Sequence, residues 1–81
     1  MPTVFRYNGF RFFFYANEGT PREPAHIHVE KSGSEAKFWL RPDVQVAYND
    51  GYGARTLREL LEIIELNRLD LERAWNEFFV A

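Results

Sequence analysis

Two stretches near the start of the chain, residues 3–7 and 10–15, are rich in aromatic and β-branched residues and flank Asn8-Gly9. An Asn-Gly pair between two such stretches is the strongest short-range signal for a β-hairpin with a two-residue turn. We therefore expect two antiparallel strands with one register. Its pairs are Tyr7 with Phe10 and Phe5 with Phe12 on one side, and Arg6 with Arg11 and Val4 with Phe13 on the other.

A second hairpin is predicted for residues 26–30 and 35–40, around the turn Lys31-Ser-Gly-Ser34. Pairing Ile27 with Phe38 and Val29 with Ala36 gives one continuous apolar face, whereas a shift of one residue would mix charged and aliphatic side chains on it. The opposite face then pairs His26 with Trp39, His28 with Lys37 and Glu30 with Glu35. Residues 44–48 are predicted to form a short final strand after the break at Pro42-Asp43.

Residues 56–80 carry apolar side chains at helical spacing, and Thr56 with Glu59 forms a capping box that predicts the start of the helix. One straight helix over this range would be about 35 Å long, against roughly 17–20 Å for a short strand. The helix must therefore overhang the sheet or bend, and the polar Asn67 marks the expected bend. Ile63, Leu66 and Leu69 lie off the main apolar stripe, which a kink or a subunit interface would explain equally well.

The pattern as a whole predicts an α+β fold: a small antiparallel sheet of four or five strands with a C-terminal helix, kinked near Asn67, on one face. We expect a single domain over residues 1–81, with strands and turns in 1–53 and the helical segment in 56–80. Fourteen aromatic residues (eight Phe, four Tyr and two Trp) supply most of the apolar surface for a core.

The amino-acid composition excludes some kinds of site and indicates where the charges lie. The chain has no cysteine, which excludes disulfides and thiolate metal sites. It has no long apolar run, so we expect a cytoplasmic, prokaryotic protein without a membrane segment. Residues 1–58 contain eight Lys or Arg and six Asp or Glu, whereas residues 59–81 contain two and six. The strand region is thus mildly basic and the helical region acidic.

His26 and His28 are the first chemical candidates, because alternation along a strand places them on the same face. Two imidazoles at this spacing can act as general acid and base, with Lys37 and Arg11 assisting. They can also bind a metal if Glu30 completes the ligand set. The third alternative, a structural or recognition role without metal or cofactor, is the one we favour, because no nucleophile or oxyanion motif accompanies the pair.

The wider outer face of the predicted sheet is aromatic and basic. Arg6 opposite Arg11 is a like-charge pair that either holds an anion or splays into solvent and pairs with Glu18 or Glu23. We predict a binding face formed by Arg6, Arg11, Phe13, Tyr15 and Trp39. Such a surface is typical of a protein interface, and also of an RNA- or single-strand-binding sheet. The remaining alternative is that a loop or the C-terminal segment covers it.

Several segments of the chain resemble one uncharacterised family of small prokaryotic proteins, the domain of unknown function 4160. They are Met1-Pro-Thr-Val-Phe-Arg6, Arg11-Phe-Phe-Phe-Tyr15, Glu23-Pro-Ala-His-Ile-His-Val29, Ala36-Lys-Phe-Trp-Leu40 and Leu71…Trp75-Asn-Glu-Phe-Phe79. The histidine-containing strand and the helix end are the most specific of these, and Ala25 departs from a proline common in relatives.

The resemblance implies a protein partner, because such proteins are often encoded beside a second small domain and many are assigned to toxin–antitoxin pairs. We therefore expect a protein-binding component of a toxin–antitoxin-like pair. The alternatives are a metal-independent ribonuclease toxin that uses His26 and His28, and a metal-binding domain. A homo-oligomer also fits the off-stripe leucines, and nucleic acid is the less favoured partner.

Overall fold

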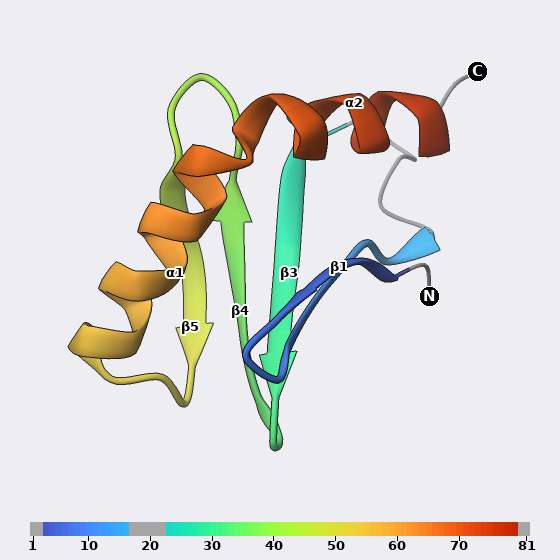
Figure 1. The fold of residues 1–81 in the computed structure, drawn as a ribbon. Coiled ribbons are helices and arrows are strands. Elements are labelled where there is room, and N and C mark those ends of the chain that lie inside the picture. Colours follow the sequence, from blue (N-terminus) through green and yellow to red (C-terminus); the bar gives the residue numbers. More distant parts are fainter. Residues whose placement is uncertain (1–2, 17–22, 80–81) are drawn as a thin grey trace.

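The computed structural model describes residues 3–16 and 23–79 (Figure 1). Five strands form one antiparallel sheet in the order of the sequence, and two helices follow. The strands are β1 (Thr3–Tyr7), β2 (Phe10–Phe13), β3 (His26–Lys31), β4 (Ser34–Trp39) and β5 (Gln45–Asp50), and the helices are α1 (Ala54–Leu66) and α2 (Arg68–Phe78). The predicted α+β class, with a C-terminal helical segment that breaks near Asn67, is confirmed.

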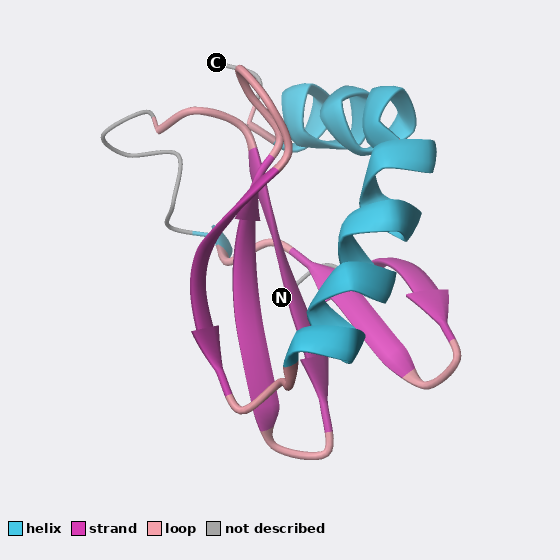
Figure 2. Cartoon of the chain, turned by 90° about the vertical axis from the view of Figure 1, so that its left-hand side faces the viewer, coloured by secondary structure: helices cyan, strands magenta, loops and turns pink. Residues whose placement is uncertain are grey.

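Both helices pack on the same face of the sheet, and the sheet curls around them (Figure 2). Helix α1 lies along the strands, while α2 runs in a different direction across the end where β3 begins (Figure 1). The core between them is aromatic and aliphatic, and its buried members are Phe10, Phe12, Phe14, Ile27, Val29, Ala36, Phe38, Leu40, Leu60, Ile64, Leu71 and Trp75.

The first hairpin turns at Asn8 and Gly9, whose φ angles of 48° and 83° are those of a type I′ turn. Three of the four predicted pairs are confirmed, and the fourth is wrong: Thr3, rather than Val4, faces Phe13. A bulge between Thr3 and Phe5 inserts one extra residue. It lets Val4 pack against the core instead of lying on the outer face.

The second hairpin has the predicted register throughout. Its turn is shorter than expected, because Lys31 pairs with Ser34 and only Ser32 and Gly33 form the loop, both with positive φ. The final strand runs from Gln45 to Asp50, later than the predicted 44–48. A register shift in its pairing with β4 leaves Ala47 between Val46 and Tyr48 without a residue opposite.

The predicted start of the helix at Thr56 is wrong. Gly53 is the N-cap in an extended conformation, and its carbonyl accepts the first helical bond from the Leu57 N–H at 3.0 Å. Thr56 therefore lies inside the first turn and has no capping role. The expected bend is present at Asn67, whose side-chain amide donates to the Ile63 carbonyl at 2.8 Å. The change of direction brings Leu71 and Trp75 into the core.

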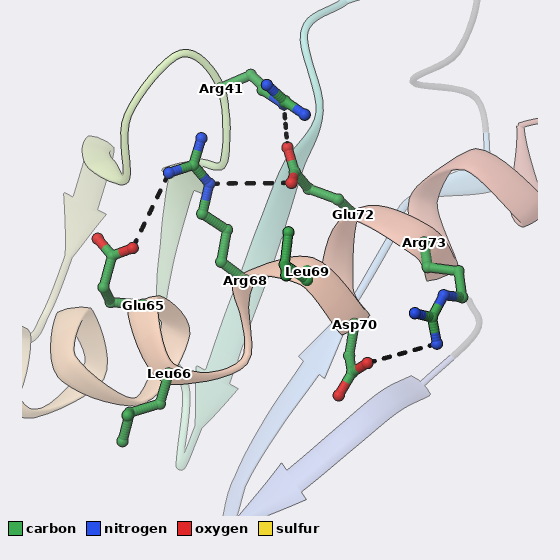
Figure 3. Close-up of a pocket in the computed structure, with 8 residues that line it drawn as sticks. All are labelled: Arg41, Glu65, Leu66, Arg68, Leu69, Asp70, Glu72 and Arg73. Carbon is green, nitrogen blue, oxygen red and sulfur yellow. Dashed lines mark ion pairs between the residues drawn. The ribbon is translucent and has the colours of Figure 1, made fainter.

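A buried carboxylate fixes the bend against the loop that follows β4 (Figure 3). Glu72 forms ion pairs with Arg41 from that loop and with Arg68 at the start of α2. Arg68 also donates to the Pro42 carbonyl at 2.9 Å. Since Glu72 is 7% exposed, these partners compensate for the loss of water around its charge. Among the described residues, neither helix is long and apolar enough to cross a membrane.

Replacing Glu72 by Gln should lower the free energy of unfolding by about 1–3 kcal/mol, because the two arginines lose a charged acceptor. Urea denaturation measures the change. Glu62→Gln, the same substitution at an exposed position of α1, is the control and should change stability by less than about 0.5 kcal/mol. Equal effects of the two substitutions would show that the Glu72 ion pairs contribute nothing.

Candidate functional site

Both histidines lie on the same face of β3, opposite Trp39 and Lys37, as predicted, but both are buried, with 0% and 1% of their surface exposed. The His26 ring packs on Trp75 from α2, with ring centroids 4.5 Å apart, and edge-on against Trp39 at 5.5 Å. Its Nδ1 lies 2.9 Å from the Pro24 carbonyl oxygen. Because that oxygen can only accept, Nδ1 carries the proton in this contact.

His28 lies in the middle of the aromatic layer. Its ring stacks on Phe13 at 5.5 Å and meets the edge of Tyr15 at 4.6 Å. The pairing of β2 with β3 places Phe13 directly opposite His28. The two histidine rings are 5.4 Å apart. The aromatic neighbours therefore hold His28 in place and restrict its access to a substrate.

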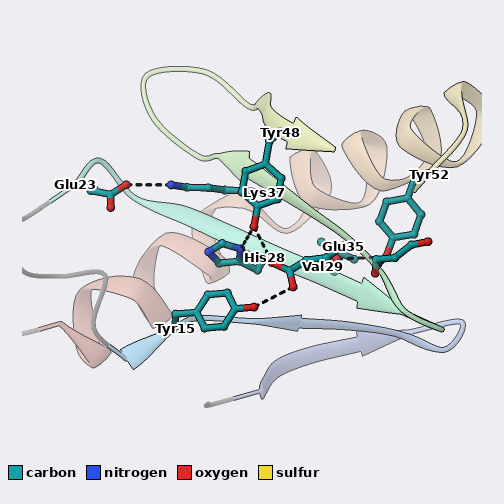
Figure 4. A network of polar contacts seen from close by, with 9 residues as sticks. Tyr15, Glu23, His28, Val29, Glu35, Lys37, Tyr48 and Tyr52 are labelled. Carbon is teal, nitrogen blue, oxygen red and sulfur yellow. Dashed lines mark hydrogen bonds and ion pairs between the residues drawn. The ribbon is translucent and has the colours of Figure 1, made fainter. Parts of the chain in front are cut away.

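A carboxylate joins this layer to two tyrosines (Figure 4). Glu35 Oε1 accepts from the Tyr15 hydroxyl at 2.9 Å, and Oε2 accepts from the Tyr48 hydroxyl at 2.7 Å. His28 Nδ1 lies 3.4 Å from both Glu35 Oε2 and the Tyr48 oxygen. Tyr15, His28 and Tyr48, which come from different parts of the sheet, thus all contact the carboxylate of Glu35. The arrangement keeps both tyrosines oriented.

Sequence reasoning singled out neither Glu35 nor Tyr48. Glu35 is two residues from Lys37, the residue opposite His28, so the predicted register already made it a diagonal neighbour of that histidine. This signal was available in the sequence pattern. Tyr48 had no comparable signal, because its position depends on how β5 pairs with β4 across the irregularity at Ala47.

The basic residues of the predicted site are engaged within the protein. Lys37 Nζ lies 3.0 Å from Glu23 Oε1 and 4.5 Å from the centre of the Trp39 ring. Arg11 Nε lies 3.6 Å from Glu30 Oε1, and its guanidinium lies over the Phe13 ring at 4.1 Å. Each cation of the predicted acid–base set is therefore close to a carboxylate and an aromatic face.

Arg6 faces Arg11 as predicted and is exposed. Arg11 pairs with Glu30 of β3 rather than with Glu23, because the β2–β3 register places Arg11 and Glu30 opposite each other. Glu18, the other expected partner, lies outside the described residues.

The structure does not assemble the alternative metal set of His26, His28 and Glu30. Glu30 points to Arg11, and its second oxygen lies 3.4 Å from the Gly33 N–H. Across residues 3–16 and 23–79, no three His, Cys, Asp or Glu side chains come together in a way that could hold a metal ion.

The predicted binding face divides into a buried and an accessible part. Phe13 is 1% exposed, so its expected place on the surface is wrong: the Arg11 guanidinium lies over its ring, and the His28 ring stacks against it. Tyr15, Trp39 and Arg11 are partly exposed, and Arg6 is exposed. Tyr48 adds a further aromatic side chain, 44% exposed, to the same face.

Tyr52 links the chain before α1 to the sheet. Its hydroxyl donates to the Val29 and Ser34 carbonyls at 3.2 and 3.0 Å. Burial, and secondarily the negative charge of Glu30, raise the pKa of this hydroxyl to about 12.

Comparison with known proteins identifies the family of the chain. A family model described as "Domain of unknown function (DUF4160)" matches residues 9–76. No curated protein matches the chain, and no solved structure does.

Tyr52→Phe should lower the free energy of unfolding by about 0.5–1.5 kcal/mol at neutral pH, because both carbonyls lose a donor. In the unfolded chain the Tyr52 hydroxyl ionises with a pKa of about 10, whereas in the folded protein its pKa is about 12. The stability that Tyr52 contributes is therefore complete below about pH 10 and is lost as the pH rises toward about 12. Urea denaturation at about pH 8 and about pH 11 should show a smaller difference between the wild-type protein and the variant at the higher pH; a constant difference would contradict the raised pKa of Tyr52.

Phe13→Asp should destabilise the protein by at least roughly 3–5 kcal/mol, because it removes a buried ring and places a carboxylate between Arg11 and His28. Circular dichroism during thermal unfolding measures the loss. Arg6→Asp is the matched control at an exposed position of the same hairpin. It replaces a like-charge pair with an attractive one, so stability should be unchanged or slightly higher. A stable Phe13→Asp variant would mean that the ring is not part of the buried layer.

Proposed function

We propose that this chain, which belongs to the family described as "Domain of unknown function (DUF4160)", is the protein-binding component of a toxin–antitoxin-like pair. The proposed interface is the outer face of the sheet. Its accessible members are Arg6, Arg11, Tyr15, Trp39 and Tyr48, with Lys37 and Glu35 between them.

The observation that carries the proposal is the burial of both imidazoles beneath this surface. A general acid or base must come within hydrogen-bond reach of the proton it transfers. His28 is 1% exposed with Nδ1 beside Glu35, and the Nδ1 proton of His26 is directed to a backbone carbonyl. These positions suit histidines that support a surface better than histidines that contact a substrate.

The accessible side chains are those that dominate protein interfaces. Tyrosine, tryptophan and arginine are enriched among the residues that carry most binding energy. Here Tyr15 and Tyr48 are already oriented by Glu35, and Lys37 by Glu23. Side chains held before binding lose less rotamer freedom on association, which favours affinity.

Charge on the same face favours a protein over a nucleic acid. Lys37 is paired with Glu23 and Arg11 with Glu30, while Glu35 adds a third carboxylate. A phosphate backbone is bound by an excess of Lys and Arg, and its affinity depends on that excess. The balanced charges of the outer face suit a mixed protein surface instead.

Co-expression with the protein encoded by the adjacent gene should give a complex that co-purifies and can be measured by titration. Trp39→Asp and Tyr48→Asp should each weaken binding by at least about 30-fold, the size of a binding hot spot of about 2 kcal/mol. Leu69→Asp is the matched control: its side chain is 74% exposed on α2 and lies off the proposed interface. It should leave affinity within about twofold.

If Leu69→Asp abolished binding and the two outer-face substitutions did not, the interface would lie on the helices and the outer-face assignment would be refuted. Growth arrest on expression of the chain by itself, abolished by a folded His28→Ala variant, would favour the ribonuclease alternative. Absence of any complex with the adjacent gene product would refute the proposed pairing.

A further inference from the structure

Strand β5 is the last strand of the sheet and has a neighbouring strand on one side only. In the described part of the chain it pairs with β4 and with no other strand. It is six residues long, contains no proline, and all its side chains except Ala47 are exposed. In Figure 2 it forms an outer margin of the sheet, with α1 set away from it. The outer edge of such a strand presents backbone N–H and C=O groups to another chain.

The opposite margin of the sheet, β1, is less suited to this role. A bulge at Val4 interrupts its ladder. Two hollows between β1 and α2 are lined by Val4 together with Ala74 and Glu77, so the helix lies close to this strand. The two edge strands therefore differ, and β5 is the one whose outer edge can pair with another strand along its length.

The negative charge around β5 indicates which kind of polypeptide could pair with this strand. Residues 42–53 contain Asp43 and Asp50 and no Lys, Arg or Glu. Both aspartates are exposed. The nearest basic residue before this segment, Arg41, is held by Glu72. A second copy of the chain paired along β5 would bring two acidic edges together, which is unfavourable. A basic segment would gain from both carboxylates.

The free edge of β5 adjoins the outer face of the sheet. Tyr48 faces Lys37 across the ladder on the outer side, while Val46 faces Phe38 on the core side. Both are large apolar side chains with substantial exposure, 44% and 38%. Alternate residues of an added strand would contact one or the other. A chain that pairs with β5 would therefore also lie against the surface that contains Tyr48 and Lys37.

We infer that β5 is a strand-addition site for an extended basic segment, with alternating apolar residues and Lys or Arg near Asp43 and Asp50. The inference rests on the proposed function in that the segment belongs to the same partner protein. Backbone hydrogen bonds supply the affinity of this binding mode, and the two aspartates with Val46 and Tyr48 supply its selectivity.

Two measurements test the inference. The first uses the full chain and a blocked peptide in which lysine alternates with valine or threonine, observed by amide NMR. At millimolar peptide, shifts should be confined to β5 and its surroundings, and the peptide with glutamate in place of lysine should bind at least tenfold more weakly. The double variant Asp43→Lys/Asp50→Lys should reverse this preference. No shift along β5, or equal binding of a backbone N-methylated peptide, would overturn strand addition.

The second measurement separates this inference from the proposed function. In the complex with the adjacent gene product, the β5 amides should exchange with solvent at least tenfold more slowly, and Asp43→Lys/Asp50→Lys should weaken binding at least tenfold. A complex that is lost with Trp39→Asp but unaffected by the aspartate reversal, with β5 exchange unchanged, would overturn the inference and leave the proposed function standing. Slowed β5 exchange with affinity unchanged by Trp39→Asp would support the edge site and refute the outer face.

Discussion

The structure depends on burying both faces of β3. Four consecutive residues of this strand, His26 to Val29, are inaccessible to solvent, although helices cover only one face of the sheet. On the helix side Ile27 and Val29 enter the apolar core. On the other side α2 reaches His26 through Trp75, while Phe13 and Tyr15 cover His28. This requirement explains the aromatic outer layer and the presence of imidazoles within it, which combine aromatic packing with hydrogen bonding.

The histidine layer meets a structural requirement and also supports the proposed interface. Glu35 contacts His28 and both tyrosyl hydroxyls, and both tyrosines are at least partly exposed. Buried polar groups are tolerated when every member finds a partner, and such networks hold their members rigidly. The same contacts that satisfy the buried groups therefore fix the orientation of Tyr15 and Tyr48. Glu35 thus contributes both to the packing of this face and to the orientation of the proposed interface.

The helix side meets a different constraint. The helical segment is longer than the sheet, and the bend at Asn67 lets both α1 and α2 place apolar residues in one core. The Arg41–Glu72–Arg68 ion pairs hold the bend against the β4–β5 loop. The cost of the bend is that Leu66 and Leu69 point outward, 81% and 74% exposed.

The sequence by itself determined the α+β class, the two hairpin registers, the shared face of His26 and His28, and the bend at Asn67. Each depends on residues close in the chain: a two-residue turn with positive φ, strand alternation, or helical spacing. Tertiary structure alone decided the pairing of β2 with β3, which buries Phe13 and gives Arg11 its partner Glu30, and the pairing of β5 with β4, which brings Tyr48 to Glu35. The bulge at Val4 and the helix start at Ala54 were also decided there. Pairings across long or irregular connections are not fixed by a local turn, so the packing of the whole sheet selects among registers that the sequence pattern leaves open.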